Sequence, residues 1–359
     1  MSQPEPRAGR LRLHPAGSGS GRRASRWLAP VLVALVAATA VLTAFVPEPQ
    51  SVAANADQGP AASVRLGYFA NATHAPALVG VEQGLISQSL QADGTQLATE
   101  VFNAGPAAVE ALNSGALDAA YIGPSPALTS YLSSGGNSLQ VIAGATTGGA
   151  SLVVSKDITE VSQLAGKNLA SPQYGGTQDV ALRNFLAEQG LSESTTVTPS
   201  SNGTVPQLFA RGAVDGAWLP EPYASLLVEN YDAHRLLDEA QLWPEGKFPT
   251  TMLVVSQRFS TEHPQSVRRL LEANQRSIDT LNAAKKNERV KLVAAGLSHA
   301  NGATLDEKVL RAALSELHFD TVVPAGTLEQ LMEHAAQVGI GPRGDLSGLL
   351  ADTAQGERP

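Results

Sequence analysis

Residues 115–124 read GALDAAYIGP and residues 212–221 read GAVDGAWLPE, two similar stretches placed 97 positions (212 − 115) apart. Each stretch joins a glycine that suits the end of a helix, an aspartate, a short apolar run with one aromatic side chain, and a proline-containing turn. One interpretation is chance repetition of a common strand-and-turn pattern, and the other is a pair of lobes with similar topology. Because ligands bind beyond the carboxyl ends of strands in parallel sheets, the second interpretation predicts that Tyr121 and Trp218 face each other across a cleft.

Outward from both stretches, short apolar strands alternate with short helices. Strands are expected at 64–68, 97–102 and 117–122, and a helix is expected at 106–113 because proline opens it and glycine follows its end. Such alternation is typical of βαβ units and largely parallel sheets. The sequence therefore predicts an α/β fold with parallel-rich sheets.

Two apolar, β-branched runs, at 151–155 and 251–256, indicate how the chain divides into lobes. We expect these runs to cross from one lobe to the other and back, which makes the first lobe discontinuous. The first lobe is predicted to comprise 63–152 and 251–340, and the second lobe 153–250. Residues 341–359 are expected to form a fraying tail.

Composition excludes several classes of protein. The chain has 359 residues and no cysteine, which excludes a disulfide framework, a thiol nucleophile, cysteine-held zinc, an iron–sulfur cluster and a lipid-modified N-terminal cysteine. The formal charge is −8 (25 − 33), and without the six arginines and two glutamates before Asp57 it is −12 (19 − 31). Phosphate contacts need clustered basic side chains, so nucleic acid is not an expected partner.

The N-terminal segment has the order of a targeting sequence. Residues 1–26 are basic, 27–46 carry no charge, and Ala54-Asn55-Ala56 places small residues before Asp57. This order predicts a signal peptide over 1–56, cleaved to release an exported periplasmic or cell-surface protein. The alternative is a retained membrane anchor over 27–46, because about 20 apolar residues can span a bilayer. Arg22-Arg23 leaves both the Sec and the twin-arginine export routes open.

Patterns for catalysis and metal binding are missing from the sequence. There is no nucleophile elbow, Walker loop, dinucleotide fingerprint or His-Glu-x-x-His motif, and the seven histidines have no metal-ligand spacing. Asp118 and Asp215 follow equivalent Gly-Ala-apolar runs, so we interpret them as residues that begin strands rather than as a catalytic pair. We expect no catalytic residue, no metal and no cofactor.

Glycine-containing loops instead indicate a binding site. Loops of this kind follow expected strands at 103–106, 123–126, 146–148 and 174–178. Glycine lets the backbone approach a ligand, and the free N–H groups and dipole of a helix start favour an anion. Four such loops together indicate binding of a small polar or anionic molecule. Asp179 either complements the dipole of its helix or, if it faces the cleft, pairs with a positive group of the ligand.

Stretches at 65–69, 74–78, 102–106, 110–112, 115–123, 171–173, 177–182 and 218–222 carry a family resemblance. They resemble substrate-binding proteins of the nitrate, sulfonate and taurine class of ABC importers. The resemblance implies a type II periplasmic-binding-protein fold, with two lobes joined by two crossing segments. It further implies a monomer that is not an enzyme, that captures a small organic or inorganic oxyanion by lobe closure, and that delivers it to the permease and ATPase subunits of an importer. The aliphatic sulfonate branch is favoured, although Gly123-Pro124 stands where those proteins often carry Gly-Asp.

Candidate ligand-binding residues follow from the loops and the resemblance. In the first lobe they are Phe69, Asn71, His74, Asn103, Gly105, Ser125, Thr146 and Thr147, and in the second lobe Thr177, Gln178, Asn202, Trp218 and Glu221. Helix capping explains Asn103 and Ser125 equally well. Trp218 is expected to wall a pocket for an alkyl chain, with packing under a helix as the alternative.

Two other functions stay open from the sequence. One is an enzyme on the same fold that resembles the menaquinone-pathway dehydratases. The thiamine-pyrimidine synthases also resemble this architecture, but they need a cysteine-rich motif that this chain lacks. The other is a ligand sensor anchored through 27–46. The identity of the oxyanion is not specified by these patterns.

Overall fold

The computed structural model describes residues 57–302, 304–323 and 325–355. The expected signal peptide and the alternative anchor over 27–46 lie outside these residues. No helix in the described part of the chain is long and apolar enough to cross a bilayer.

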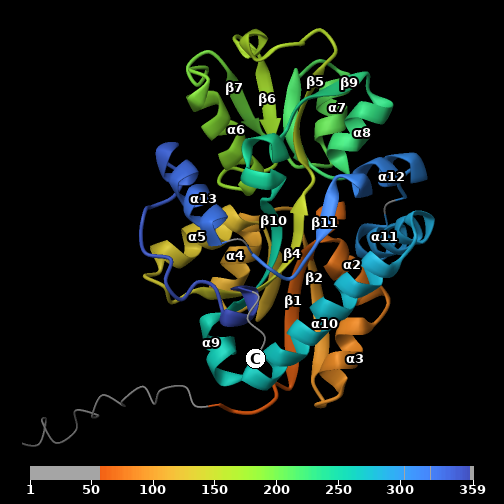
Figure 1. The fold of residues 1–359 in the computed structure, drawn as a ribbon, viewed down its shortest axis with the longest axis vertical. Coiled ribbons are helices and arrows are strands. Elements are labelled where there is room, and N and C mark those ends of the chain that lie inside the picture. The colour runs from red at the N-terminus through yellow and green to blue at the C-terminus, as the bar shows by residue number, and fades with distance from the viewer. Residues whose placement is uncertain (1–56, 303, 324, 356–359) are drawn as a thin grey trace, which may run out of the picture. The chain divides into compact units, whose positions relative to one another are not determined.

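The first of two sheets has six strands in the order β11-β4-β10-β3-β1-β2 (Figure 1). Strands β2, β1 and β3 run parallel, whereas β10 is antiparallel to both β3 and β4, and β11 is antiparallel to β4. The strands are β1 (Ser63–Phe69), β2 (Gln96–Phe102), β3 (Ala119–Ile122), β4 (Leu139–Gly148), β10 (Pro249–Ser256) and β11 (Leu317–Phe319). The sheet therefore combines segments from both ends of the described chain.

The second sheet has five strands in the order β7-β6-β8-β5-β9. Strands β7, β6 and β8 run parallel, and β5 is antiparallel to β8 and β9. The strands are β5 (Ala150–Ser155), β6 (Asn168–Ser171), β7 (Thr196–Pro199), β8 (Gly216–Pro220) and β9 (Ala233–Asp238). The predicted α/β fold is confirmed, although the sheets are mixed and not parallel-rich: an antiparallel strand follows the three parallel ones in each.

The similarity between 115–124 and 212–221 reflects equivalent topology. The order β2-β1-β3-β10 in one sheet matches β7-β6-β8-β5 in the other, with an antiparallel strand beside β3 and beside β8. Asp118 Oδ2 accepts the Arg65 N–H at 2.8 Å, and Asp215 Oδ2 accepts the Asn168 N–H at 2.8 Å, so each aspartate secures the neighbouring parallel strand. The interpretation as two similar lobes is confirmed, and so is the structural role of both aspartates.

The crossings between the sheets lie beside the predicted runs and not within them. Residues 151–155 belong to β5 in the second sheet, and 251–256 belong to β10 in the first. The chain leaves the first sheet at Gly148 and Gly149, whose φ angles are +76° and +73°, and it returns between β9 and β10. Apolar, β-branched residues form the strands on either side, whereas the first joint needs left-handed backbone that glycine adopts without strain. The prediction of crossing at 151–155 and 251–256 is therefore wrong by a few residues.

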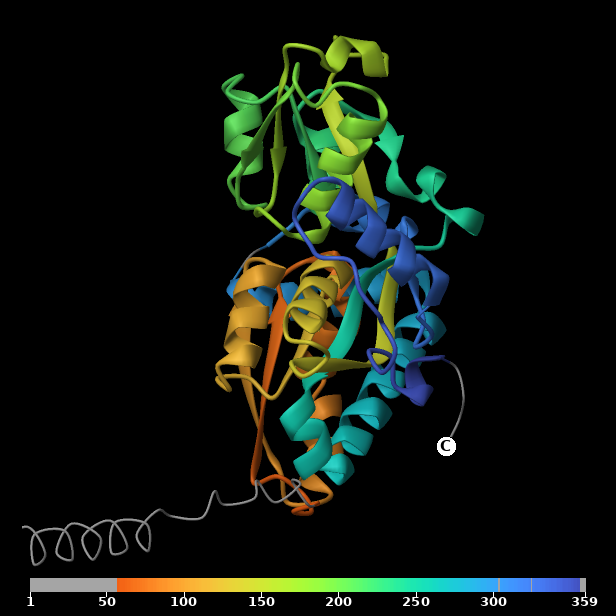
Figure 2. The same cartoon turned by 90° about the vertical axis from the view of Figure 1, so that its left-hand side faces the viewer.

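Helices cover both faces of each sheet (Figure 1). On the first sheet, Leu253 and Val255 of β10 pack under α2 (Ala75–Glu82), α3 (Leu85–Gln91), α10 (Pro264–Ala283) and α11 (Lys286–Asn301). The alternate residues Met252 and Val254 pack with α4 (Gly105–Asn113), α5 (Pro124–Ser133) and α13 (Ala325–Gln337), and Figure 2 shows α4 and α5 turned toward the viewer. The second sheet is enclosed by α6 (Thr177–Glu188), α7 (Val205–Ala210) and α8 (Tyr223–Asn230).

The expected fraying tail is packed against the first sheet over its described part, 341–355. The Val141 N–H donates to the carbonyl of Leu349 at 2.8 Å, and Val141 forms a parallel bridge with Leu350. Leu349 and Ala354 are buried in the core that α4 and α5 share. The prediction of a fraying tail is wrong here, because apolar side chains and main-chain hydrogen bonds hold this stretch on a sheet edge that β11 covers only partly.

Candidate ligand-binding site

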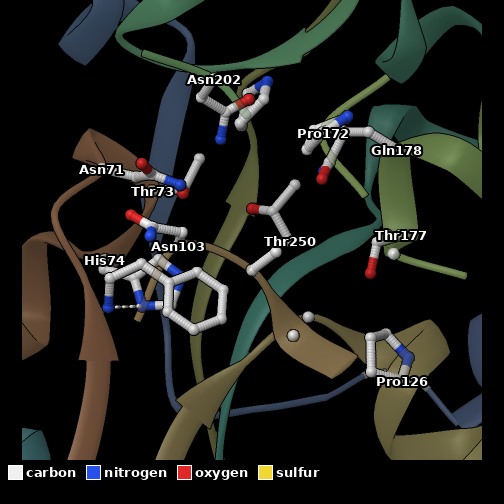
Figure 3. Close-up of a pocket in the computed structure, with 16 residues that line it drawn as sticks. Asn71, Thr73, His74, Asn103, Pro126, Pro172, Thr177, Gln178, Asn202 and Thr250 are labelled. Atoms are coloured by element: carbon white, nitrogen blue, oxygen red, sulfur yellow. Dashed lines mark hydrogen bonds between the residues drawn. The ribbon is translucent and has the colours of Figure 1, made fainter. Parts of the chain in front are cut away.

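A cavity lies beyond the carboxyl ends of strands from both sheets (Figure 3). Its lining residues end or follow β1, β2, β3, β6, β7 and β8, or lie at the start of β10. The space open to the centre of a water-sized sphere is about 30 Å³, which corresponds to two or three waters at about 10–15 Å³ each. The lining residues are Phe69, Asn71, Thr73, His74, Asn103, Ala104, Gly105, Gly123, Pro126, Pro172, Gly176, Thr177, Gln178, Asn202, Pro220 and Thr250.

Four helix starts meet at this cavity. His74, Ala104, Gly123 and Gly176 are the N-cap residues of α2, α4, α5 and α6, and all four line it. None of these four caps has a side-chain hydrogen bond to the first turn. The positive ends of four helix dipoles therefore meet at one small space, which favours a negative charge there. Prolines in the first turns of α2, α4 and α5 leave fewer N–H groups to donate, and the Ser125 N–H of α5 already bonds to Thr177.

The described lining carries no formal charge. Its only titratable side chain is His74, and complete burial lowers the pKa of His74 to about 3, so the imidazole is neutral. The ring stacks on Phe69 with centroids 4.3 Å apart, and His74 Nδ1 accepts the Phe69 N–H at 3.3 Å. Because Nδ1 is an acceptor, the proton of the neutral ring sits on Nε2 and makes it a donor.

Two buried carboxylates near the cavity are already paired. Asp179 accepts the Ser171 hydroxyl at 2.5 Å, the Gly175 N–H at 3.0 Å and Arg183 Nε at 3.0 Å. Glu221 pairs with Arg235 at 2.7 Å and accepts the Ser225 N–H at 3.1 Å, and burial, opposed by Arg235, raises its pKa. Glu221 does not line the cavity, contrary to prediction, because its carboxylate turns toward Arg235. Asp179 does not line the cavity either, so of its two interpretations the structure favours complementation of the α6 dipole over pairing with the ligand.

The two sheets are linked across the cavity by short contacts. The Ser125 N–H at the start of α5 donates to Thr177 Oγ1 of α6 at 3.3 Å, and the Thr73 N–H donates to the carbonyl of Glu221 at 3.4 Å. A Cβ on Gly123 would clash with Thr177 Oγ1 and would lie 3.3 Å from Thr177 Cβ. The two halves of the cavity wall are thus in contact in this arrangement.

Eight of the thirteen predicted site residues are brought together in the lining. They come from both sheets and are Phe69, Asn71, His74, Asn103, Gly105, Thr177, Gln178 and Asn202. Their contact with a ligand stays a prediction.

Three further candidates lie near the cavity without lining it. Ser125 is fully buried in α5, where its backbone N–H is used by Thr177. Thr146 and Thr147 do not open a helix as expected, because β4 continues to Gly148 and pairs there with β10 and β11.

The prediction that Trp218 and Tyr121 face each other across a cleft is wrong. Trp218 is 0% exposed, packs against Phe185 in the core of the second sheet, and donates from Nε1 to Glu239 Oε2 at 2.7 Å. Tyr121 is 1% exposed and donates its hydroxyl to Asn274 Oδ1 at 3.0 Å. Both strands are covered by helices on both faces, so an aromatic side chain inside the strand enters a core. Position 220, two residues beyond Trp218, is the one that reaches the cavity.

Eight lining residues were not among the predicted site residues, although most lie in loops or motifs identified from the sequence. Gly123, Pro126, Gly176, Ala104, Pro172 and Pro220 are within the quoted loops and motifs, and Thr73 stands beside His74. Thr250 carries no sequence signal, because the register of β10 alone places it at the cavity.

Comparison with known proteins follows this geometry. Residues 57–296 match the NMT1-like family. Over 214 residues the chain is 28% identical to a putative binding protein of Brucella abortus, a match that covers 58% of this chain and 63% of that protein. The taurine-binding periplasmic protein of Escherichia coli is 26% identical over 170 residues, 46% of this chain and 52% of the relative. The chain thus spans less than two thirds of the length of these relatives.

Solved structures show the same fold. The alkanesulfonate-binding protein of Xanthomonas axonopodis pv. citri bound to MOPS superposes with a TM-score of 0.66 at 21% identity, covering 79% of this chain and 95% of that one. The nitrate-binding protein of Synechocystis PCC 6803 superposes with a TM-score of 0.63 at 14% identity, covering 78% and 82%. The periplasmic-binding-protein fold implied by the family resemblance is confirmed. Because the family match extends over well more than half of its length, the chain belongs to the NMT1-like family.

Proposed function

We propose that this protein is the solute-binding component of an ABC importer and that it captures a small organic or inorganic oxyanion. Two lobes would close on the solute: the first comprises 63–152 and 251–340, and the second comprises 153–250. The boundary at the first crossing lies at Gly148 and Gly149, a few residues before the predicted one. The exported monomer would then deliver the solute to the permease and ATPase subunits. The binding-protein relatives support this proposal through their names.

One observation supports an oxyanion as the solute: four helix starts without side-chain caps meet at a cavity whose described lining is uncharged. Each helix terminus contributes about 0.3–1 kcal/mol toward an anion, and more where water is excluded. Thr177, Gln178, the asparagines and His74 Nε2 supply neutral donors. An anion is therefore favoured without a lysine or arginine in the described lining.

An aliphatic sulfonate is our best candidate within this class. The sulfonate group would occupy the space between the helix starts, and Phe69, Pro126, Pro172 and Pro220 supply the apolar lining for a short alkyl group. A binding role fits the lining better than an enzymatic one, because general acid–base catalysis near neutral pH needs a group that titrates there. His74, with a pKa of about 3, is not such a group.

Thermal unfolding with matched solutes tests this proposal. Methanesulfonate, ethanesulfonate, nitrate and sulfate are the anions, and dimethyl sulfone, a neutral analogue of methanesulfonate, is the control. An anion at ~100 times its Kd should stabilise the folded protein by about 2.7 kcal/mol, and dimethyl sulfone should not. Stabilisation by the sulfone or a neutral sugar, with no response to any anion, would contradict the proposal.

A further inference from the structure

Asn202 places an unsatisfied acceptor at the cavity. It follows β7 in the turn before α7, is 6% exposed and lines the cavity, and its side chain points into it (Figure 3). No donor in the described part of the chain bonds to Asn202 Oδ1, although the atom is buried. A buried acceptor without a donor is destabilising, so a bound solute that supplies an N–H or O–H would gain from meeting this one.

The charge of that donor is restricted by the rest of the lining. A carboxylate would be needed to pair with a buried ammonium group, and the sixteen described lining residues include neither aspartate nor glutamate. The neighbouring carboxylates of Asp179 and Glu221 are committed to Arg183 and Arg235. The four helix starts add positive potential, which opposes a cation further. A neutral donor fits this lining and an ammonium group does not.

Resting on the proposed function, we infer that the solute is a small anion that carries an uncharged N–H or O–H donor, and that Asn202 is the residue that selects it. Zwitterions that combine an oxyanion with an ammonium group are excluded by the same site. The relative from Escherichia coli is named for taurine, which is such a zwitterion. This chain is thereby assigned a different selectivity within the shared fold.

Three sulfonates that differ in one group test this inference on the unmodified protein. They are propane-1-sulfonate, isethionate and taurine, which carry a methyl, a hydroxyl and an ammonium group at the same position. Calorimetric titration should give a Kd for isethionate that is about tenfold lower than that of propane-1-sulfonate, in keeping with one hydrogen bond. Taurine should bind at least about a hundredfold more weakly than isethionate, because its charge is buried unpaired. The trio of propanoate, glycolate and glycine repeats the comparison on a carboxylate.

Asn202→Asp narrows the preference for isethionate over taurine about a hundredfold if Asn202 acts as inferred. The carboxylate has nearly the shape of the amide but pairs with an ammonium and repels an anion, so taurine should gain and isethionate should lose about tenfold each. Gln88→Glu, an exposed position on α3, introduces the same charge away from the cavity and should change neither Kd. The ranking on the unmodified protein decides the matter even if the Asn202 variant does not fold.

The outcomes separate this inference from the function on which it rests. Binding of anions with taurine equal to or tighter than isethionate, or glycine equal to or tighter than glycolate, overturns the inference and leaves oxyanion capture standing. A ratio of the isethionate Kd to the taurine Kd that Asn202→Asp leaves unchanged overturns the role of Asn202. A failure of every anion in both trios and in the earlier screen overturns the proposed function itself.

Discussion

Trp218 is part of a core and not of the cavity wall, so its removal should affect folding and not affinity. The side chain is fully buried against Phe185 and donates to Glu239. We expect Trp218→Ala to lower the free energy of unfolding by about 3–5 kcal/mol, the usual cost of such a cavity. Urea denaturation measures this loss, and calorimetry on the folded fraction should return an unchanged Kd. A weaker Kd with undiminished stability would return Trp218 to the binding site.

Glu239 is a buried carboxyl group whose pKa burial raises to about 7, from an ordinary value of 4.5, with opposition from the Trp218 indole. Between pH 4.5 and 7 the folded chain therefore holds a proton that the unfolded chain releases. The contribution of this group to stability is present below pH 4.5 and is lost as pH rises through 7, at about 1.4 kcal/mol per pH unit at most.

Glu239→Gln keeps an acceptor for the Trp218 indole and removes this titration. The variant is expected to be more stable than the unmodified protein at pH 8 and to have no advantage at pH 4.5. Urea midpoints at both pH values check the prediction, and the difference between the two proteins cancels the titration of all other groups. A difference in stability that does not vary with pH would contradict it.

At the scale of elements, the starts of α5 and α6 meet through Gly123 and Thr177. Gly123→Ala places a methyl group against Thr177 Oγ1, which prevents the two helix starts from approaching as they do here. The Kd for an anion should then rise about tenfold or more, because closure is needed to complete the set of helix starts. Combining Gly123→Ala with Thr177→Ala should restore part of the affinity, whereas Gly326→Ala at an open position in α13 should have no effect. Independent, additive effects of the two substitutions would show that this contact does not limit closure.

The order of the elements was predictable, whereas the depth of each side chain was not. The repeat at 115–124 and 212–221 indicated two lobes because strand, aspartate and turn recur locally in the sequence. Phe69, Asn103 and Thr177 were found because each stands directly at a strand end or helix start. Trp218 was misplaced because burial depends on which helices cover the strand, and Thr250 was missed because its position depends on pairing with a strand far away in sequence. Local sequence patterns predict where the site lies, whereas long-range packing decides which residues reach it.

At the scale of the described molecule, two sheets joined near Gly148 and Gly149 should move as lobes. Solute contacts from both sides of the cavity would give a closed form the higher affinity, so a solute is expected to shift the population toward it. Small-angle scattering is expected to show a smaller radius of gyration when an anion is bound, and Gly123→Ala should reduce this change. An unchanged radius together with measurable binding would mean that the lobes are already closed without solute.

The uncharged lining also determines how the protein exchanges protons with its surroundings. Asparagine, threonine and glutamine side chains and helix starts would hold an anion without taking up or releasing a proton, because His74 stays neutral far above its pKa of about 3. The number of protons bound to the protein should therefore be the same before and after the anion binds. The heat of binding should then be equal in buffers of different ionisation enthalpy. Uptake built on such a cavity is insulated from the acidity of the medium, a property that a lysine- or histidine-based anion site would not confer.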